Sequence, residues 1–322
     1  MADFLARPIS RRRFIRIGAT IATVAFVPSA LAAAAPALRR WSGSALGAHA
    51  SIELVGADAD LADATFVAVE QEISRLEALF SLYRTDSALS RLNATGRLDV
   101  PEADVLQLLA LVRSVHAETG GLFDPTVQPL FAAYAAHYTS GREDPLPTAE
   151  LAECLKLVGF DQVAFDENVV RFAQPGMAMT LNGVAQGYIT DRIADVLRAR
   201  DFDNVLLDIG EIQALGVGRD GNGWKVGLAA GPNNDALSAT LRLKDRAVAT
   251  SMMDGTVLDA AGRVGHILHP RKGAVASAFS AVSVVAPEAA LADALSTAAV
   301  LMTQEELSRF SRAGVEVHTT PV

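Results

Sequence analysis

The chain has 322 residues, a formal net charge of −9, one cysteine, and hydrophobic residues at half of its positions. This composition allows a large buried core, in one large domain or two ordinary ones. The acidic balance argues against a nucleic-acid partner, which would favour a basic surface. The single cysteine leaves no intrachain disulfide and no cysteine-based zinc motif.

Residues 1–35 have the layout of an export signal. A basic start at Arg11–Arg13 is followed by an apolar run and then by alanine-rich sequence that would permit cleavage. The segment Ser10–Phe14 resembles a twin-arginine (Tat) signal. The alternative is an uncleaved membrane anchor, but glycine, threonine, proline and serine interrupt the apolar run. We therefore expect a Tat-type signal over 1–35, a periplasmic location, and no stable membrane insertion after cleavage.

The remaining sequence predicts a mixture of helices and strands without strict alternation, in which the pattern over 177–210 is typical of a strand–helix–strand unit. Expected helices cover 60–79, 101–118, 147–159, 187–200 and 288–301, with a short one after Ser87. Expected strands cover 49–54, 177–181, 204–210 and 315–320, with a hairpin over 162–173 and short strands between 224 and 285. This mixture favours an α+β fold, and the absence of a clear linker favours one domain over 36–322.

The stretch "LADALSTAAVLM" over 291–302 is a nearly all-apolar helix that contains an acid and a hydroxyl. Asp293 and Thr297 are four residues apart, so they share one face of the helix. A buried carboxylate requires a cation, a metal or several hydrogen-bond donors, and no Lys or Arg follows before Arg309. One interpretation is a Mg²⁺ site; the other is that Asp293 faces water while Thr297 bonds to its own helix.

The stretch "TLNGVAQGYITDR" over 180–192 predicts a glycine-containing turn that leads into a helix near Gly187–Tyr188. Main-chain N–H groups at such a junction can bind phosphate, and Gly183 and Gly187 would let a ligand approach the backbone. An ordinary turn with small residues for packing is the alternative.

Two further segments contain residues suited to ligand binding. In "GHILHPRKG", His266 is a candidate base or phosphate contact, whereas His269, Arg271 and Lys272 are expected in a solvated turn. In "FSLYRTDSALSRLN", Tyr83 could stack on a planar ligand.

Seven segments occur in an order that resembles the ApbE-like family of FAD:protein FMN transferases. They are "SLYRTDSALSRLN", "GGLFDPTVQPL", "LNGVAQGY", "DIGEIQALG", "AVATS", "GHILHPRKG" and "VVAPEAALADALST". The N-terminal signal and the segments "TLNGVAQGYITD" and "DIGEIQALG" are most similar to the NosX-type branch, which is associated with nitrous-oxide respiration.

The resemblance implies a single ApbE-like domain and a function. FMN would be transferred from FAD to a Thr or Ser hydroxyl of a periplasmic or membrane-anchored flavoprotein, with release of AMP. Mg²⁺ would be held by Asp293, Thr297 and the main-chain carbonyl of Ala185.

The resemblance also implies roles for other residues. His266 would be the catalytic base or a phosphate contact. The FAD-binding positions would be Tyr83, Gly183, Ala185, Gln186, Gly210, Ser251 and His266. Some motif positions differ from the family pattern, such as Gln186, where Lys or Glu is frequent. Two alternatives therefore stay open, a periplasmic FAD carrier or sensor without catalysis, and a FAD pyrophosphatase that yields FMN and AMP.

Overall fold

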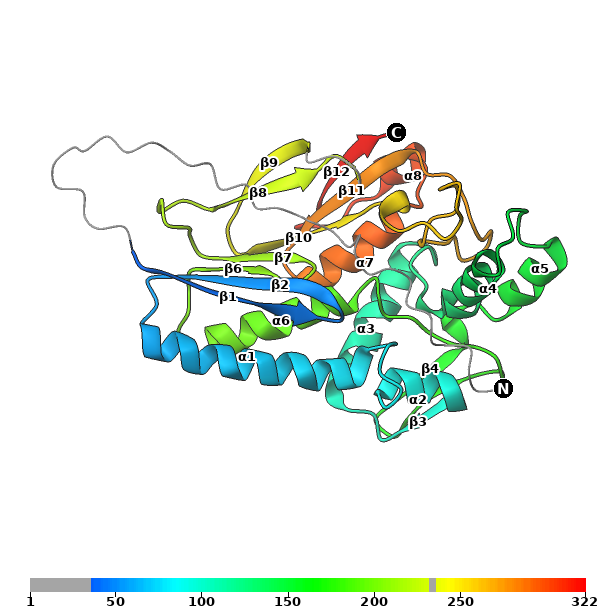
Figure 1. The fold of residues 1–322 in the computed structure, drawn as a ribbon, viewed down its shortest axis with the longest axis horizontal. Helices are drawn as coiled ribbons and strands as arrows, with labels where there is room; N and C mark the ends of the chain where they lie inside the picture. The colour runs from blue at the N-terminus through cyan, green and yellow to red at the C-terminus, as the bar shows by residue number, and fades with distance from the viewer. Residues whose placement is uncertain (1–35, 232–235) are drawn as a thin grey trace.

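The computed structural model describes residues 36–231 and 236–322, so the predicted signal at 1–35 lies outside the described residues. A seven-stranded sheet forms the centre of the fold (Figure 1), and each neighbouring pair in it is antiparallel. In spatial order its strands are β1 (Leu38–Ala45), β2 (Ala48–Val55), β6 (Val205–Asp208), β7 (Ile212–Leu215), β10 (Arg246–Ser251), β11 (Phe279–Ala286) and β12 (Glu316–Pro321).

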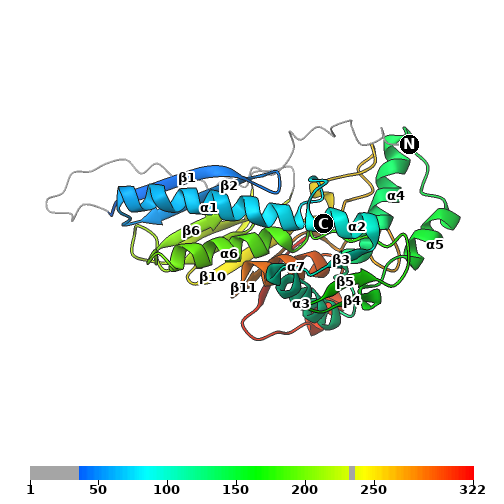
Figure 2. The same ribbon diagram turned by 90° about the horizontal axis from the view of Figure 1, so that it is seen from below.

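Three helices cover one face of this sheet, as Figures 1 and 2 show, and they are α1 (Ala59–Phe80), α6 (Ala185–Arg198) and α7 (Ala289–Ala299). Their apolar faces and the sheet share the main core, in which Val69, Ile193 and Ala294 are fully buried. The hairpin of β8 (Trp224–Ala229) and β9 (Leu237–Leu243) packs on the other face, where Trp224 and Val248 belong to a second core.

The remaining elements extend the fold at one end of the sheet (Figure 1). The helices there are α2 (Ala88–Thr95), α3 (Ala103–Glu118), α4 (Gln128–Thr139) and α5 (Thr148–Lys156). A three-stranded sheet lies beside them, with β3 (Arg97–Asp99), β5 (Val169–Phe172) and β4 (Val163–Phe165) in spatial order. Helix α8 (Gln304–Arg309) precedes β12. No helix in 36–231 or 236–322 is both long and apolar enough to cross a membrane.

The α+β fold class is confirmed, as are the expected helices at α1, α3, α5, α6 and α7, to within a few residues at each end. Strands β2, β6 and β12 and the β4–β5 hairpin are confirmed as well. The elements that the sequence did not reveal are β1, β3, β7, α4 and α8.

The predicted strand at 177–181 is wrong, and no strand–helix–strand unit forms there. The main-chain partners of this segment are not a neighbouring strand. Asn93 in α2 binds Met179 at both main-chain groups: the Asn93 side-chain amide donates to the Met179 carbonyl, and the Met179 N–H donates to Asn93 Oδ1, each at 2.8 Å. The Thr180 N–H donates to the carbonyl of Pro125. The side chain of Asn93, 86 residues away, therefore makes the hydrogen bonds that a neighbouring strand would make. The alternation of residues within 177–181 cannot reveal such a partner.

Candidate functional site

A tight turn over residues 181–185 leads into α6, whose first turn forms part of the site. The N–H groups of Val184 and Ala185 both donate to the carbonyl of Leu181, at 3.0 and 2.8 Å. Helix α6 then starts at Ala185, two residues before the predicted start, and Ala185 is buried. The first N–H groups of a helix have no partner within the helix, so they are available to other groups. One of them, on Gly187, donates to Asp293 Oδ2 at 3.2 Å.

Helix α7 lies directly against this first turn of α6. A Cβ atom on Gly187 would lie 2.4 Å from the Ala289 carbonyl oxygen, and one on Gly183 would lie 2.8 Å from Thr297 Oγ1. Gly187 is therefore required by the approach of a second helix, and the prediction that it admits a ligand is wrong. The close contact brings Asp293 and Thr297 to the N-terminus of α6.

Asp293 is buried, with 4% of its surface exposed, so the interpretation that it faces water is wrong. Burial raises the pKa of Asp293; the Gly187 N–H opposes this shift, and the nearby Asp191 carboxylate adds to it. No cation is among the groups that change this pKa. A buried carboxylate in such surroundings is short of positive charge, which is the condition expected of a metal ligand before the metal binds.

Hydroxyl groups surround the same face of α7. The Ser251 and Ser296 hydroxyls are 2.8 Å apart, and the Ser251 hydroxyl is 3.4 Å from Thr297 Oγ1. Ser251 is the last residue of β10, so the end of a sheet strand meets the last turn of α7. The Ser296 hydroxyl also donates to the Asp293 carbonyl at 3.0 Å. The predicted positions Ser251 and Thr297 are therefore neighbours.

The turn between β6 and β7 completes the cluster. Gly210 has a φ of +85°, a conformation that favours glycine, and a Cβ there would lie 2.5 Å from Gln186 Nε2. Gln186 lies in the first turn of α6. The structure thus brings together six of the predicted positions, Gly183, Gln186, Gly210, Ser251, Asp293 and Thr297, with Ala185 at the start of α6.

Three acids around this cluster escaped the sequence analysis. Asp191, one turn after Gly187, has its pKa raised to about 7 by burial, against two main-chain N–H bonds. Burial raises the pKa of Asp208 to about 6, with His49 opposing it, and burial together with Asp293 and Asp208 raises the pKa of Glu211. Asp208 and Glu211 flank Gly210 in "DIGEIQALG", a spacing that could have pointed to them. The site is therefore rich in carboxyl groups.

His266 lies on the loop between β10 and β11. The main-chain N–H of His266 donates to the Thr256 carbonyl at 2.9 Å, and the ring Nδ1 lies 3.2 Å from the same carbonyl oxygen. Because a carbonyl only accepts, the proton of a neutral ring is assigned to Nδ1 and the lone pair to Nε2. Burial lowers the pKa of His266, against the main-chain groups of Thr256 and Met253, and this favours the neutral ring. In the described part of the chain, no hydrogen bond or ion pair joins His266 to Asp293 or Thr297.

Two other sequence predictions fare differently. His269 was expected in a solvated turn, but it is buried, and its Nδ1 accepts from the Arg271 N–H at 3.1 Å. That prediction is wrong for His269, although Arg271 and Lys272 are exposed. Tyr83 has 68% of its surface exposed in the turn between α1 and α2, and its contact with a ligand stays a prediction.

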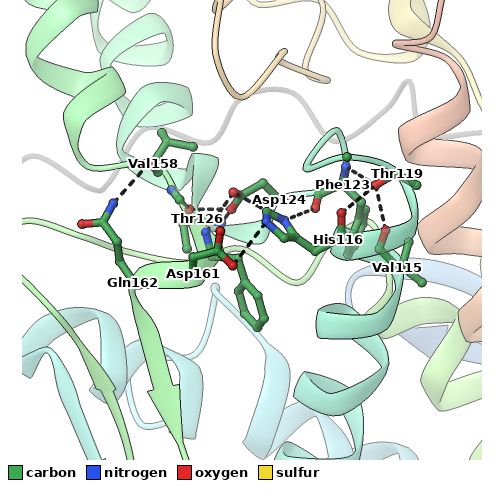
Figure 3. A network of polar contacts seen from close by, with 12 residues as sticks. Val115, His116, Thr119, Phe123, Asp124, Thr126, Val158, Asp161 and Gln162 are labelled. Atoms are coloured by element: carbon green, nitrogen blue, oxygen red, sulfur yellow. Dashed lines mark hydrogen bonds and ion pairs between the residues drawn. The ribbon is translucent and has the colours of Figure 1, made fainter. Parts of the chain in front are cut away.

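A buried polar network supports the segment that precedes α6 (Figure 3). Asp124 accepts from the Thr126 N–H at 2.9 Å and the Phe160 N–H at 3.0 Å, and His116 Nδ1 lies 3.7 Å from its carboxylate. The Thr126 hydroxyl donates to Asp124 and accepts from the Gly159 N–H at 2.7 Å. Within the motif "GGLFDPTVQPL", Pro125–Val127 form a short 3₁₀ helix that leads into α4. The network holds Pro125 in place. The Pro125 carbonyl in turn accepts from the N–H of Thr180, three residues before Gly183.

The raised pKa of Asp208 predicts a pH dependence of stability. Its native pKa of about 6 lies above the ordinary 3.8, so this group's stabilisation is full below about pH 4 and is lost as the pH rises through 6. Asp208→Asn removes that loss. Relative to the unmodified protein, the variant should therefore gain free energy of unfolding, on the order of 2 kcal/mol, between pH 4.5 and 8.

Urea denaturation of the metal-free protein at both pH values measures this difference. The matched control is Asp195→Asn on α6, an exposed acid that is paired with Arg192 and Arg198. An equal response of the two variants would contradict the assignment to Asp208.

Comparison with known proteins places this geometry in context. The model of the ApbE family matches residues 46–319, nearly the whole described chain. A FAD:protein FMN transferase of Klebsiella pneumoniae is 30% identical, with 72% of each chain covered. One of Haemophilus influenzae is 26% identical, covering 82% of this chain and 81% of its own. The solved structure of the ApbE protein from Thermotoga maritima has the same fold, with a TM-score of 0.78 at 24% identity, over 88% of this chain and 94% of that one.

Proposed function

Because the chain belongs to the ApbE family, we propose that it is a FAD:protein FMN transferase, which moves FMN from FAD to a Thr or Ser hydroxyl of an acceptor protein and releases AMP. The observation that carries this proposal is the buried Asp293 carboxylate, placed with the Thr297 hydroxyl against the first turn of α6. Phosphate chemistry needs positive charge, and a divalent cation held by Asp293 and Thr297 would supply it.

The donor set fits Mg²⁺. Asp293 is a buried carboxylate with no cation among the groups that shift its pKa, and the hydroxyl of Thr297 lies one helical turn away. Hard divalent cations prefer such oxygen ligands and leave positions for phosphate oxygens. The carbonyl of Ala185 is the proposed third ligand. Bound Mg²⁺ would neutralise charge on the pyrophosphate of FAD.

The protein groups have separate tasks in the transfer. The positive end of the α6 helix dipole is proposed to face the pyrophosphate. Gly183 and Gly210 keep the walls of the site free of side chains beside Thr297 and Gln186. Ser251, Gln186 and Tyr83 are proposed contacts of FAD.

His266 is proposed to accept the proton of the acceptor hydroxyl. That oxygen attacks the phosphorus of the FMN half, and the bond from this phosphorus to the bridging oxygen breaks. AMP leaves with the bridging oxygen, and the proton moves to Nε2 of His266, which has its lone pair available.

The location and acceptor are proposed from sequence alone. The Tat-type pattern at 1–35 supports export to the periplasm, where the acceptor would be a soluble or membrane-anchored flavoprotein. Similarity to the NosX-type branch supports an acceptor connected with nitrous-oxide reduction.

Intact-mass spectrometry tests the proposal. The mature protein is mixed with FAD, Mg²⁺ and a periplasmic FMN-binding domain that has an acceptor threonine, and the matched control replaces that threonine by valine. We expect one FMN phosphoester on the threonine protein only, and none with EDTA. Intact FAD without an adduct would indicate a carrier, and free FMN with AMP would indicate a pyrophosphatase; either result would overturn the transferase.

A further inference from the structure

The start of α7 is capped by an acid from another helix. The N–H groups of Ala289 and Ala290 donate to Asp191 Oδ1 at 2.7 Å and to Asp191 Oδ2 at 2.9 Å. Glu288, the residue that precedes α7, makes no capping bond with its own side chain. The first N–H groups of α7 are therefore satisfied from α6, 98 residues earlier in the chain.

Asp191 acts together with Gly187, one turn before it on the same face of α6. The Gly187 N–H holds Asp293 Oδ2, while Asp191 holds α7 one turn before Asp293. Between these two bonds the Ala289 carbonyl rests against the bare Cα of Gly187. The contacts of α7 with Asp191 and with the Gly187 N–H are one helical turn apart on α6. Together they fix the position of α7 along α6 and its rotation about its own axis.

A local cap would stabilise α7 without a buried charge. Ser or Asp at position 288 would satisfy the same N–H groups and stabilise the helix. Asp191 instead is mostly buried, and Asp293, Glu288 and Asp195 are acids close enough to interact with it. Its interaction with Asp293 adds negative charge beside the proposed metal ligand. A divalent cation bound beside these two carboxyl groups would favour their charged forms.

We propose that Asp191 is a positioning residue for the metal site, which holds Asp293 and Thr297 against the first turn of α6 and strengthens the binding of a divalent cation there. The inference rests on the proposed function, because that function requires the cation. It assigns Asp191 no contact with FAD or with the reacting atoms.

Asn is the sharpest replacement for Asp191. It has nearly the same shape, but only one of its two terminal atoms accepts, and its amide would face the second N–H of α7. Asp195→Asn is the matched control, since it removes one acid from the next turn of α6, where Asp195 is exposed and paired with Arg192 and Arg198.

The probe is Mn²⁺, whose binding is measured by loss of the free-ion electron paramagnetic resonance signal, with FAD present and no acceptor. We expect Asp191→Asn to weaken Mn²⁺ binding at least tenfold, and Asp195→Asn to leave it unchanged. The half-saturating Mg²⁺ concentration for transfer should rise by the same factor, while kcat at saturating Mg²⁺ changes less than threefold. A folded Asp191→Asn variant that binds Mn²⁺ within twofold of the unmodified protein overturns the inference.

A double variant separates positioning from capping, and it serves also if the single variant folds poorly. Glu288→Ser restores a local cap in the Asp191→Asn background. The inference predicts recovery of Tm without recovery of Mn²⁺ affinity, and recovery of both overturns it. Failure of the proposed function would look different, because the unmodified protein itself would then neither bind Mn²⁺ with FAD nor transfer FMN.

Discussion

Asp293→Asn should lower Mg²⁺-dependent transfer of FMN by a factor on the order of 10² or more. The proposed cation stabilises charge by several kcal/mol, and each 1.36 kcal/mol corresponds to tenfold in rate. Asn retains an oxygen that can accept from the Gly187 N–H at 3.2 Å, so the contact between α6 and α7 is kept. The loss would therefore come from the missing negative charge and not from a moved helix.

Stability measurements separate these two causes. The metal-free variant should unfold at the same or a higher temperature than the unmodified protein at pH 8, since a buried carboxylate without a cation partner has been removed. Mg²⁺ with FAD should raise the Tm of the unmodified protein and leave that of Asp293→Asn unchanged. An Asp293→Asn variant with full turnover and an ordinary Mg²⁺ response would rule out Asp293 as the ligand.

His266→Ala should reduce kcat by about 10²–10⁴, the range of general-base catalysis, while the Kd of FAD changes far less. The reason is the assigned tautomer, in which Nδ1 is bonded to the Thr256 carbonyl and Nε2 has the lone pair. Burial lowers the pKa of His266 below its ordinary 6.5, so the acidic limb of the kcat profile should lie below pH 6.5. Stopped-flow single turnovers across pH 5–8 measure this limb.

His269→Gln is the matched control for this histidine. His269 is buried three residues further on, and its Nδ1 accepts from the Arg271 N–H. Its replacement should lower Tm and leave kcat per folded enzyme unchanged. If His266→Ala weakens FAD binding and leaves kcat intact, His266 is a binding residue and the base lies elsewhere.

The sequence predicted best those elements whose hydrophobic spacing is visible within one segment, without knowledge of what the segment packs against. The helical spacing in α1 and α6 and the stacked Asp293 and Thr297 follow from one helix at a time. Burial of Asp293 required the third dimension, because it depends on Gly187 admitting α7 against α6.

Two of the failures share a physical cause, which is a partner far away in the chain. The segment 177–181 alternates like a strand, but Asn93 and Pro125 take the place of the neighbouring strand. Asp191 reads as an ordinary polar residue on α6, and only the approach of α7, 98 residues later, makes it a cap. No periodicity within either segment contains that information.

The most direct test of the central claim is the position of the metal. A crystal of the protein with FAD and Mn²⁺, measured for anomalous scattering of manganese, locates the ion independently of activity. The site described here predicts a peak in contact with the Asp293 carboxylate and the Thr297 hydroxyl, at the N-terminus of α6. A manganese peak beside FAD that contacts neither Asp293 nor Thr297 would contradict it.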